Sequence, residues 1–133
     1  MSANEKSFVI IDDDPINNLI CQKIISLTLP GAEIWTFTDP EAGLAHIQSR
    51  FQTGSCNRAL LFLDINMPSL TGWEVLDLIH GNAGLAHDNV RIYMLSSSVD
   101  LNDQEKAREN PLISGYLTKP LTQNKFLALT DSF

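Results

Sequence analysis

Residues 8–15 read FVIIDDDP, an apolar run that ends abruptly in three aspartates and a proline. Consecutive apolar residues without polar alternation are typical of a parallel strand that helices cover on both faces. Asp14 followed by Pro15 marks a helix start, because aspartate caps the free N–H groups and proline fits the first helical position. The stretch therefore predicts a buried strand that leads directly into a helix, with Asp12 and Asp13 at the junction.

The alternation of strand and helix continues along the whole chain. The predicted strands are Phe8–Ile11, Ala32–Phe37, Ala59–Leu63, Arg91–Leu95 and Ile113–Leu117. In the first helix, Ile16, Leu19, Ile20, Ile24 and Leu27 form one apolar stripe, the pattern of an amphipathic helix. Asp39 before Pro40 starts the second helix. The remaining helices are predicted around Gly72–His80, Asn102–Glu109 and Thr122–Thr130.

Strand–helix units in strict alternation predict an α/β fold with a doubly wound, five-stranded parallel sheet, since right-handed crossovers of this length place helices on both faces. A chain of 133 residues is long enough to bury one sizeable core but not two. No internal repeat or low-complexity linker interrupts the series. We therefore expect residues 1–133 to form a single domain.

Composition narrows the class of protein. With 44% hydrophobic and 19% charged residues, the chain has the make-up of an ordinary globular protein. A net charge of −7 argues against direct binding to nucleic acid or anionic lipid, which needs a dense basic surface. The apolar runs are too short for membrane insertion, the N-terminus lacks a secretory signal, and Cys21 and Cys56 are too few for a disulfide framework. We expect a cytoplasmic protein.

Polar residues follow four of the predicted strands, where ligands bind in open α/β sheets. They are Asp12, Asp13 and Asp14 after the first strand, Asp64 after the third, Ser96, Ser97 and Ser98 after the fourth, and Thr118 and Lys119 after the fifth. If the fold is correct, these residues converge on one rim of the sheet.

Clustered carboxylates raise one another's pKa unless a cation neutralises them. A hard divalent ion meets this need, and Mg²⁺ prefers oxygen ligands while it retains several waters. Lys119 carries a compact charge that can pair with a carboxylate or with an incoming phosphoryl oxygen. Asp14 is assigned to capping, which leaves Asp12, Asp13 and Asp64 as the candidate acidic site.

Four segments of the chain together resemble the receiver domains of two-component signalling. These segments are residues 9–15 (VIIDDDP), 63–68 (LDINMP) with Gly72, 94–96 (MLS) and 115–120 (GYLTKP). The resemblance covers essentially the whole chain, and the four segments in this order are highly specific. It implies a flavodoxin-like (βα)5 fold with the strand order 2-1-3-4-5.

The resemblance also implies a role for each matching residue. Asp64 would be the phosphoacceptor. Asp12 and Asp13 would hold Mg²⁺ together with Asp64 and the backbone carbonyl of Asn66. Lys119 would pair with the phosphoryl group, and Ser96 and Tyr116 would be the switch residues. Ser97 departs from the family, which usually has a small apolar residue there. Phosphorylation would change the surface of the fourth helix, fifth strand and fifth helix.

The implied partners are a sensor histidine kinase or histidine phosphotransfer protein and a downstream protein target. Surface residues around the first helix, such as Asn17, Asn18 and Gln22, are expected to influence the choice of kinase. Because the chain ends just after the fifth predicted helix, we expect a stand-alone receiver without an output module. Such a domain is not an enzyme beyond, at most, slow self-dephosphorylation.

Two alternatives remain open at this point. A Mg²⁺-dependent phosphohydrolase also uses an aspartate nucleophile after a parallel strand, but it usually carries a second aspartate two residues later, where this chain has Asn66. A receiver-like binding module that has lost phosphorylation is the second alternative. The complete set of Asp12, Asp13, Asp64, Ser96 and Lys119 argues against that reading.

Overall fold

The computed structural model of the protein describes residues 6–51, 58–81, 89–97 and 101–130. They form a parallel sheet in the order β2-β1-β3-β4-β5, which confirms the predicted fold class and strand order. The elements are β1 (Lys6–Ile11), α1 (Pro15–Thr28), β2 (Glu33–Phe37), α2 (Pro40–Arg50), β3 (Arg58–Asp64), α3 (Gly72–His80), β4 (Val90–Ser96), α4 (Leu101–Glu109), β5 (Ile113–Thr118) and α5 (Gln123–Thr130). Cys56 and Ser98 lie outside the described residues.

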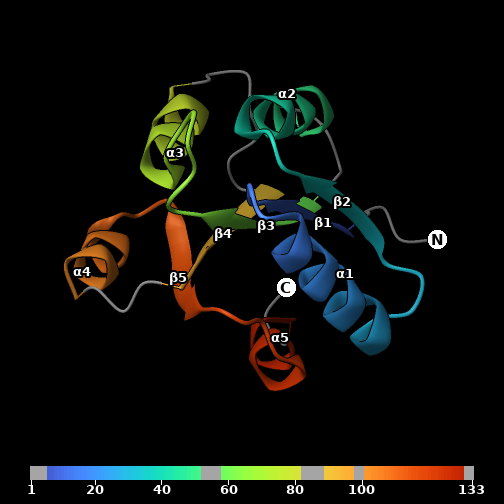
Figure 1. The fold of residues 1–133 in the computed structure, drawn as a ribbon. Helices are drawn as coiled ribbons and strands as arrows, with labels where there is room; N and C mark the ends of the chain where they lie inside the picture. Colours follow the sequence, from blue (N-terminus) through green and yellow to red (C-terminus); the bar gives the residue numbers. More distant parts are fainter. Residues whose placement is uncertain (1–5, 52–57, 82–88, 98–100, 131–133) are drawn as a thin grey trace.

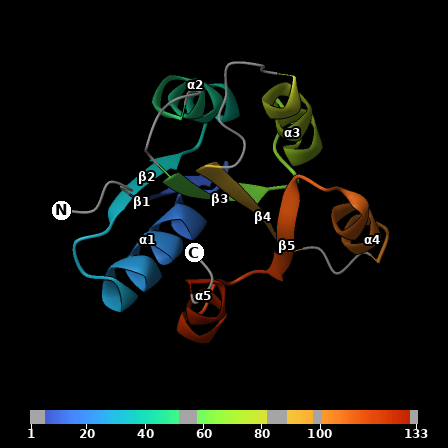
Figure 2. The same ribbon diagram turned by 180° about the vertical axis from the view of Figure 1, so that it is seen from behind.

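Helices cover both faces of the sheet. Figures 1 and 2 show α1 and α5 below the sheet and α2 and α3 above it, with α4 beside β5. Side chains of β1 alternate between two hydrophobic clusters: Val9 and Ile11 pack on the α2 and α3 side, and Phe8 and Ile10 pack on the α1 and α5 side. The central strands are therefore buried on both faces, as their continuous apolar sequence predicted.

The predicted helix starts are confirmed by their capping hydrogen bonds. Asp14 accepts a hydrogen bond from the backbone N–H of Ile16 at 2.9 Å, and Asp39 accepts one from Glu41 at 3.1 Å. These bonds satisfy backbone donors that have no partner within the helix. Because α1 begins immediately after β1, the cap also places Asp12 and Asp13 in the short turn between the two elements.

Most of the apolar stripe of the first helix faces solvent, although Ile24 packs against the hydrophobic core. Ile16 is 68% exposed and Leu27 is 71% exposed, and Leu19 and Ile20 also face solvent. The face of α1 that is buried carries Asn17, Asn18, Cys21 and Ile25. The sequence pattern thus identified an apolar face of the helix, but this face lies on the surface of the domain.

Parallel pairing aligns the C-terminal ends of the strands at one edge of the sheet. The backbone N–H of Asp12 donates to Phe37 at 3.0 Å, and the N–H of Lys119 donates to Ser96 at 2.9 Å. These bonds extend the sheet contacts into the turns that carry the polar residues. Within the described part of the chain, every helix is too short or too polar to cross a lipid bilayer.

Candidate acidic site at the edge of the sheet

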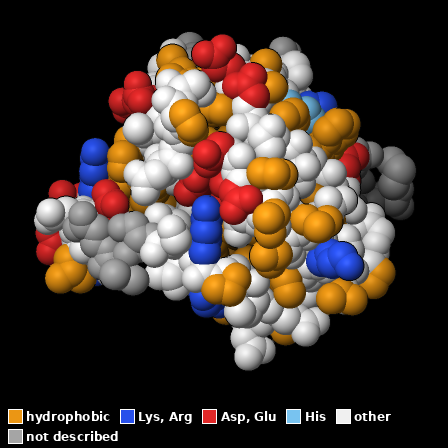
Figure 3. Space-filling model, in the orientation of Figure 1, with side chains coloured by type: hydrophobic (Ala, Val, Ile, Leu, Met, Phe, Trp, Pro, Cys, Tyr) orange, Lys and Arg blue, Asp and Glu red, His pale blue; other side chains and the backbone are white. Residues whose placement is uncertain are grey.

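Three carboxylates meet where β1 and β3 end. One oxygen from each of Asp12, Asp13 and Asp64 lies within 4.8 Å of the others. Asp12 and Asp64 are buried, whereas Asp13 is exposed. Figure 3 shows acidic side chains gathered near the centre of the visible face, with a basic side chain directly beneath them. The site is therefore open to solvent on the side of Asp13.

Lys119 provides a positive charge next to the two buried carboxylates. Its Nζ lies 2.7 Å from Oδ2 of Asp12 and 3.4 Å from Oδ1 of Asp64. Burial alone would lower the pKa of Lys119, but the hydrogen bond and charge of Asp12, reinforced by Asp64, raise the pKa above its ordinary value. The side chain therefore stays protonated and is held more closely by Asp12 than by Asp64.

Asp64 is under electrostatic strain in the free protein. Burial and the nearby charge of Asp12 raise its pKa to about 7, and Lys119 offsets only part of this effect. Three carboxylates beside one ammonium group leave an excess of negative charge. Their oxygen atoms are the donors that hard divalent cations prefer, and the exposed Asp13 leaves the cluster accessible. The residues present therefore fit a divalent metal ion such as Mg²⁺.

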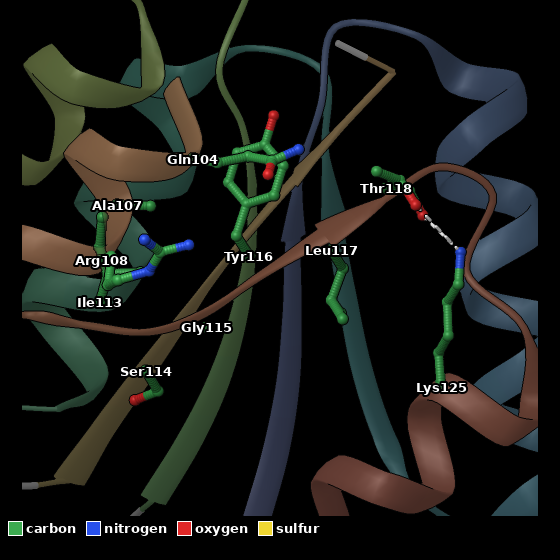
Figure 4. Close-up of a pocket in the computed structure, with 10 residues that line it drawn as sticks. All are labelled: Gln104, Ala107, Arg108, Ile113, Ser114, Gly115, Tyr116, Leu117, Thr118 and Lys125. Carbon is green, nitrogen blue, oxygen red and sulfur yellow. Dashed lines mark hydrogen bonds between the residues drawn. The ribbon is translucent and has the colours of Figure 1, made fainter. Parts of the chain in front are cut away.

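Two further predicted residues lie on the neighbouring strands. Ser96 is buried at the end of β4, paired in register with Thr118, and Tyr116 pairs with Met94 two residues earlier on each strand. Tyr116 is half-buried and lines a hollow of about 560 Å³ between α4 and β5, together with Gln104 and other residues (Figure 4). Ser96 thus lies at the acidic edge, and Tyr116 lies at the adjoining surface.

The acidic, hydroxyl and basic residues of this site occur in a stretch of the chain that matches a known protein family. A family model described as the response regulator receiver domain matches residues 8–131. The chain belongs to this family. It is a receiver domain of two-component signalling, and receivers as a class are phosphoacceptor signalling domains that interact with histidine kinases and downstream targets.

Solved receiver structures support the same assignment. A two-component response regulator from Cytophaga hutchinsonii is 32% identical and superposes with a TM-score of 0.85, with 97% of this chain and 96% of that chain covered. A receiver protein from Dyadobacter fermentans is 26% identical, with a TM-score of 0.83 and 96% of both chains covered. The chemotaxis protein CheY4 of Vibrio cholerae, at 20% identity, 96% and 97% coverage and a TM-score of 0.74, shares the fold. No curated protein matches the chain.

Gly72 lets the third helix of the receiver lie directly against the strand that carries Asp64. A Cβ atom at Gly72 would lie 2.5 Å from the backbone oxygen of Asp64 and 3.0 Å from Cα of Ile65. The Gly72 N–H also donates to the backbone oxygen of Ile65 at 2.8 Å. Cε of Met94 would lie 2.8 Å from the same Cβ, but because the other two obstructing atoms belong to the backbone, only glycine fits here without displacing the end of β3.

Two residues expected on the partner-facing surface of the receiver are in fact buried. Asn17 and Asn18 are each 5% exposed, and their side-chain amides donate to Asp12. The expectation that these two residues lie on the surface is therefore wrong, whereas Gln22 is exposed as expected. The sequence did contain a sign that these residues bind Asp12, because two adjacent amide side chains occur in the first turn of the helix that follows the aspartates.

Proposed function

We propose that this receiver is a switch that is turned on by Mg²⁺-dependent phosphorylation of Asp64. The observation that carries the proposal is the position of Asp64, a buried carboxylate at the end of a central strand that faces Asp12, Asp13 and Lys119. Phosphoryl transfer requires little covalent chemistry from a protein beyond a positioned acceptor and cations that absorb the developing charge. Asp64 would be the acceptor, and Lys119 together with a bound Mg²⁺ would be the cations.

The transfer proceeds by displacement at phosphorus. An oxygen of the ionised Asp64 forms the new O–P bond while the bond between phosphorus and the donor breaks, and the donor group leaves with the electron pair. Asp12, Asp13, Asp64 and the backbone carbonyl of Asn66 would hold Mg²⁺, which supplies positive charge to the phosphoryl oxygens. Lys119 moves its ammonium from Asp12 towards the new phosphoryl group.

The phosphodonor is a phosphohistidine on a sensor kinase or a histidine phosphotransfer protein. The exposed apolar face of α1 is a suitable docking surface for it, because Ile16 begins that face three residues after Asp13 of the acidic cluster. Leu19 and Ile20 continue the face away from the site. Figure 3 shows hydrophobic side chains over α1 beside the acidic cluster. A helical partner packed on this face would bring a histidine close to Asp64.

A single labelling experiment separates the proposal from its two rivals. The protein is incubated with a small acyl or amido phosphate and Mg²⁺, and both its mass and the free phosphate are followed. We expect one labile phosphoryl adduct per molecule. Continuous turnover without an accumulated adduct would instead indicate a phosphohydrolase, and the absence of both would indicate a binding module that has lost phosphorylation.

The output surface is formed by α4, β5 and α5, and its target is a downstream protein that binds this surface. Ser96 at the acidic edge can donate a hydrogen bond to the phosphoryl group, and its movement leaves space that Tyr116 can occupy. Within α4, Ala107 alone is buried, so few apolar contacts hold this helix in place. A charge-assisted hydrogen bond worth roughly 1.5 to 3 kcal/mol is enough to shift such an equilibrium about tenfold or more.

We expect Ser96→Ala to accept phosphate at Asp64 but to switch poorly, because it lacks the hydroxyl that contacts the phosphoryl group. Amide hydrogen exchange with and without the phosphate mimic beryllofluoride measures the switch. In the wild type, the exchange rates should change between Ser96 and Phe126. Ser97→Ala is the matched control, since Ser97 is exposed. Changes confined to α1 and α2 in the wild type would refute this mechanism.

A further inference from the structure

Asp12 is held by an unusually complete set of donors. Its Oδ1 accepts a hydrogen bond from the backbone N–H of Asp14 at 2.9 Å. Its Oδ2 accepts two short contacts, one from Nδ2 of Asn17 at 2.7 Å and one from Nζ of Lys119, also at 2.7 Å. The two donors to Oδ2 differ in charge: Asn17 is neutral, and Lys119 is a cation.

The Asn17 side chain is fixed in place by its surroundings. It is 5% exposed on the face of α1 that packs against the sheet, and its Nδ2 also lies 3.7 Å from the fully buried Sγ of Cys21. A buried amide that lost its acceptor would carry the cost of an unsatisfied donor. We therefore expect Asn17 to remain bound to Asp12 when Lys119 moves at the open side of the site.

Lys119, in contrast, has a second carboxylate to which it can bind. Its Nζ already lies 3.4 Å from Oδ1 of Asp64, and the proposed phosphorylation adds negatively charged oxygens at that carboxylate. A shift of the ammonium towards Asp64 removes one of the two donors from Oδ2 of Asp12. Of the two side-chain donors described at Oδ2 of Asp12, Asn17 is then the one that remains.

We propose that Asn17 is a positioning residue that keeps the Asp12 carboxylate oriented for Mg²⁺ while Lys119 moves between Asp12 and the phosphoryl group on Asp64. The inference rests on the proposed function. Being neutral, the amide orients the carboxylate without cancelling the negative charge that attracts a divalent cation. Groups that orient metal ligands in this way affect metal affinity strongly, although they do not touch the metal.

Asn18 provides a matched control within the same helix. It is buried to the same extent as Asn17, but its Nδ2 donates to the backbone oxygens of Asp12 and Phe37, at 3.0 and 3.4 Å, and not to a carboxylate. Asn18 thus ties α1 to the turn after β1 without orienting the acidic group. Its loss should affect stability but not the Asp12 side chain.

The test measures the Mg²⁺ affinity of the full chain by tryptophan fluorescence or calorimetry, with folding checked by thermal unfolding. We expect Asn17→Ala and the similarly sized Asn17→Leu to weaken Mg²⁺ binding by about tenfold. Asn18→Ala should destabilise the protein while its Mg²⁺ affinity is unchanged. Folded Asn17 variants that bind Mg²⁺ like the wild type, or an equal loss in Asn18→Ala, would overturn the inference.

A double-mutant cycle tests the exchange between the two donors. In a Lys119→Met background, Asn17 is the remaining side-chain donor to Oδ2 of Asp12, so Asn17→Leu should reduce Mg²⁺ affinity by a larger factor than it does beside an intact Lys119. Equal factors in both backgrounds would contradict the proposed exchange. If the wild type itself bound no Mg²⁺, the proposed function would fail. Normal binding with insensitive Asn17 variants would overturn this inference alone.

Discussion

Asp64→Asn is expected to abolish the stoichiometric phosphorylation of the protein by a small phosphodonor. An amide oxygen lacks the negative charge of the carboxylate and is a poor nucleophile towards phosphorus, so the O–P bond cannot form at this position. The neighbouring acids are poor substitutes, since Asp12 is buried and is held by Asn17 and Lys119. Intact-mass measurement with and without Mg²⁺ gives a direct readout.

Asp77→Asn is the matched control for this experiment. Asp77 is an exposed aspartate on α3, so the substitution makes the same chemical change outside the acidic cluster. We expect Asp77→Asn to be labelled like the wild type. Labelling of Asp64→Asn at the wild-type rate and extent would show that another residue accepts the phosphoryl group.

The same Asp64→Asn substitution is expected to stabilise the metal-free protein at neutral and alkaline pH. Burial and the charge of Asp12 raise the pKa of Asp64 from its ordinary value of 3.8 to about 7, so ionisation of this group costs more in the folded protein than in the unfolded chain. The change in pKa corresponds to at most about 4 kcal/mol of folding free energy. Asparagine removes this cost because it does not ionise.

The stabilisation should depend on pH in a defined direction. Below pH 3.8 the carboxyl is protonated in both states and has no ionisation cost; the cost grows as pH rises and is complete above about pH 7. Urea unfolding without metal should therefore give a difference between variant and wild type that is small near pH 4 and largest near about pH 8. Added Mg²⁺ should narrow the difference in stability between Asp64→Asn and the wild type, because it binds the folded wild type more tightly. A pH-independent difference would contradict the electrostatic origin.

Much of the fold was predictable because its signals are local. Continuous apolar runs such as Ala59–Leu63 identified the strands, and the pairs Asp14-Pro15 and Asp39-Pro40 placed two helix starts correctly. Once the strands are parallel, their C-terminal ends must lie at one edge of the sheet. For this reason the order of the motifs was sufficient to bring Asp12, Asp13, Asp64 and Lys119 together.

The orientation of the first helix depended on long-range contacts instead. Helical periodicity shows that Ile16, Leu19 and Leu27 share an apolar face, but it does not show which face lies on the sheet. A buried carboxylate needs hydrogen-bond donors, and Asn17 and Asn18 satisfy Asp12 only if their side of α1 packs inwards. That requirement turns the apolar face towards solvent. The need of Asp12 for these donors arises only when folding brings the groups together, so a local pattern of hydrophobicity does not predict it.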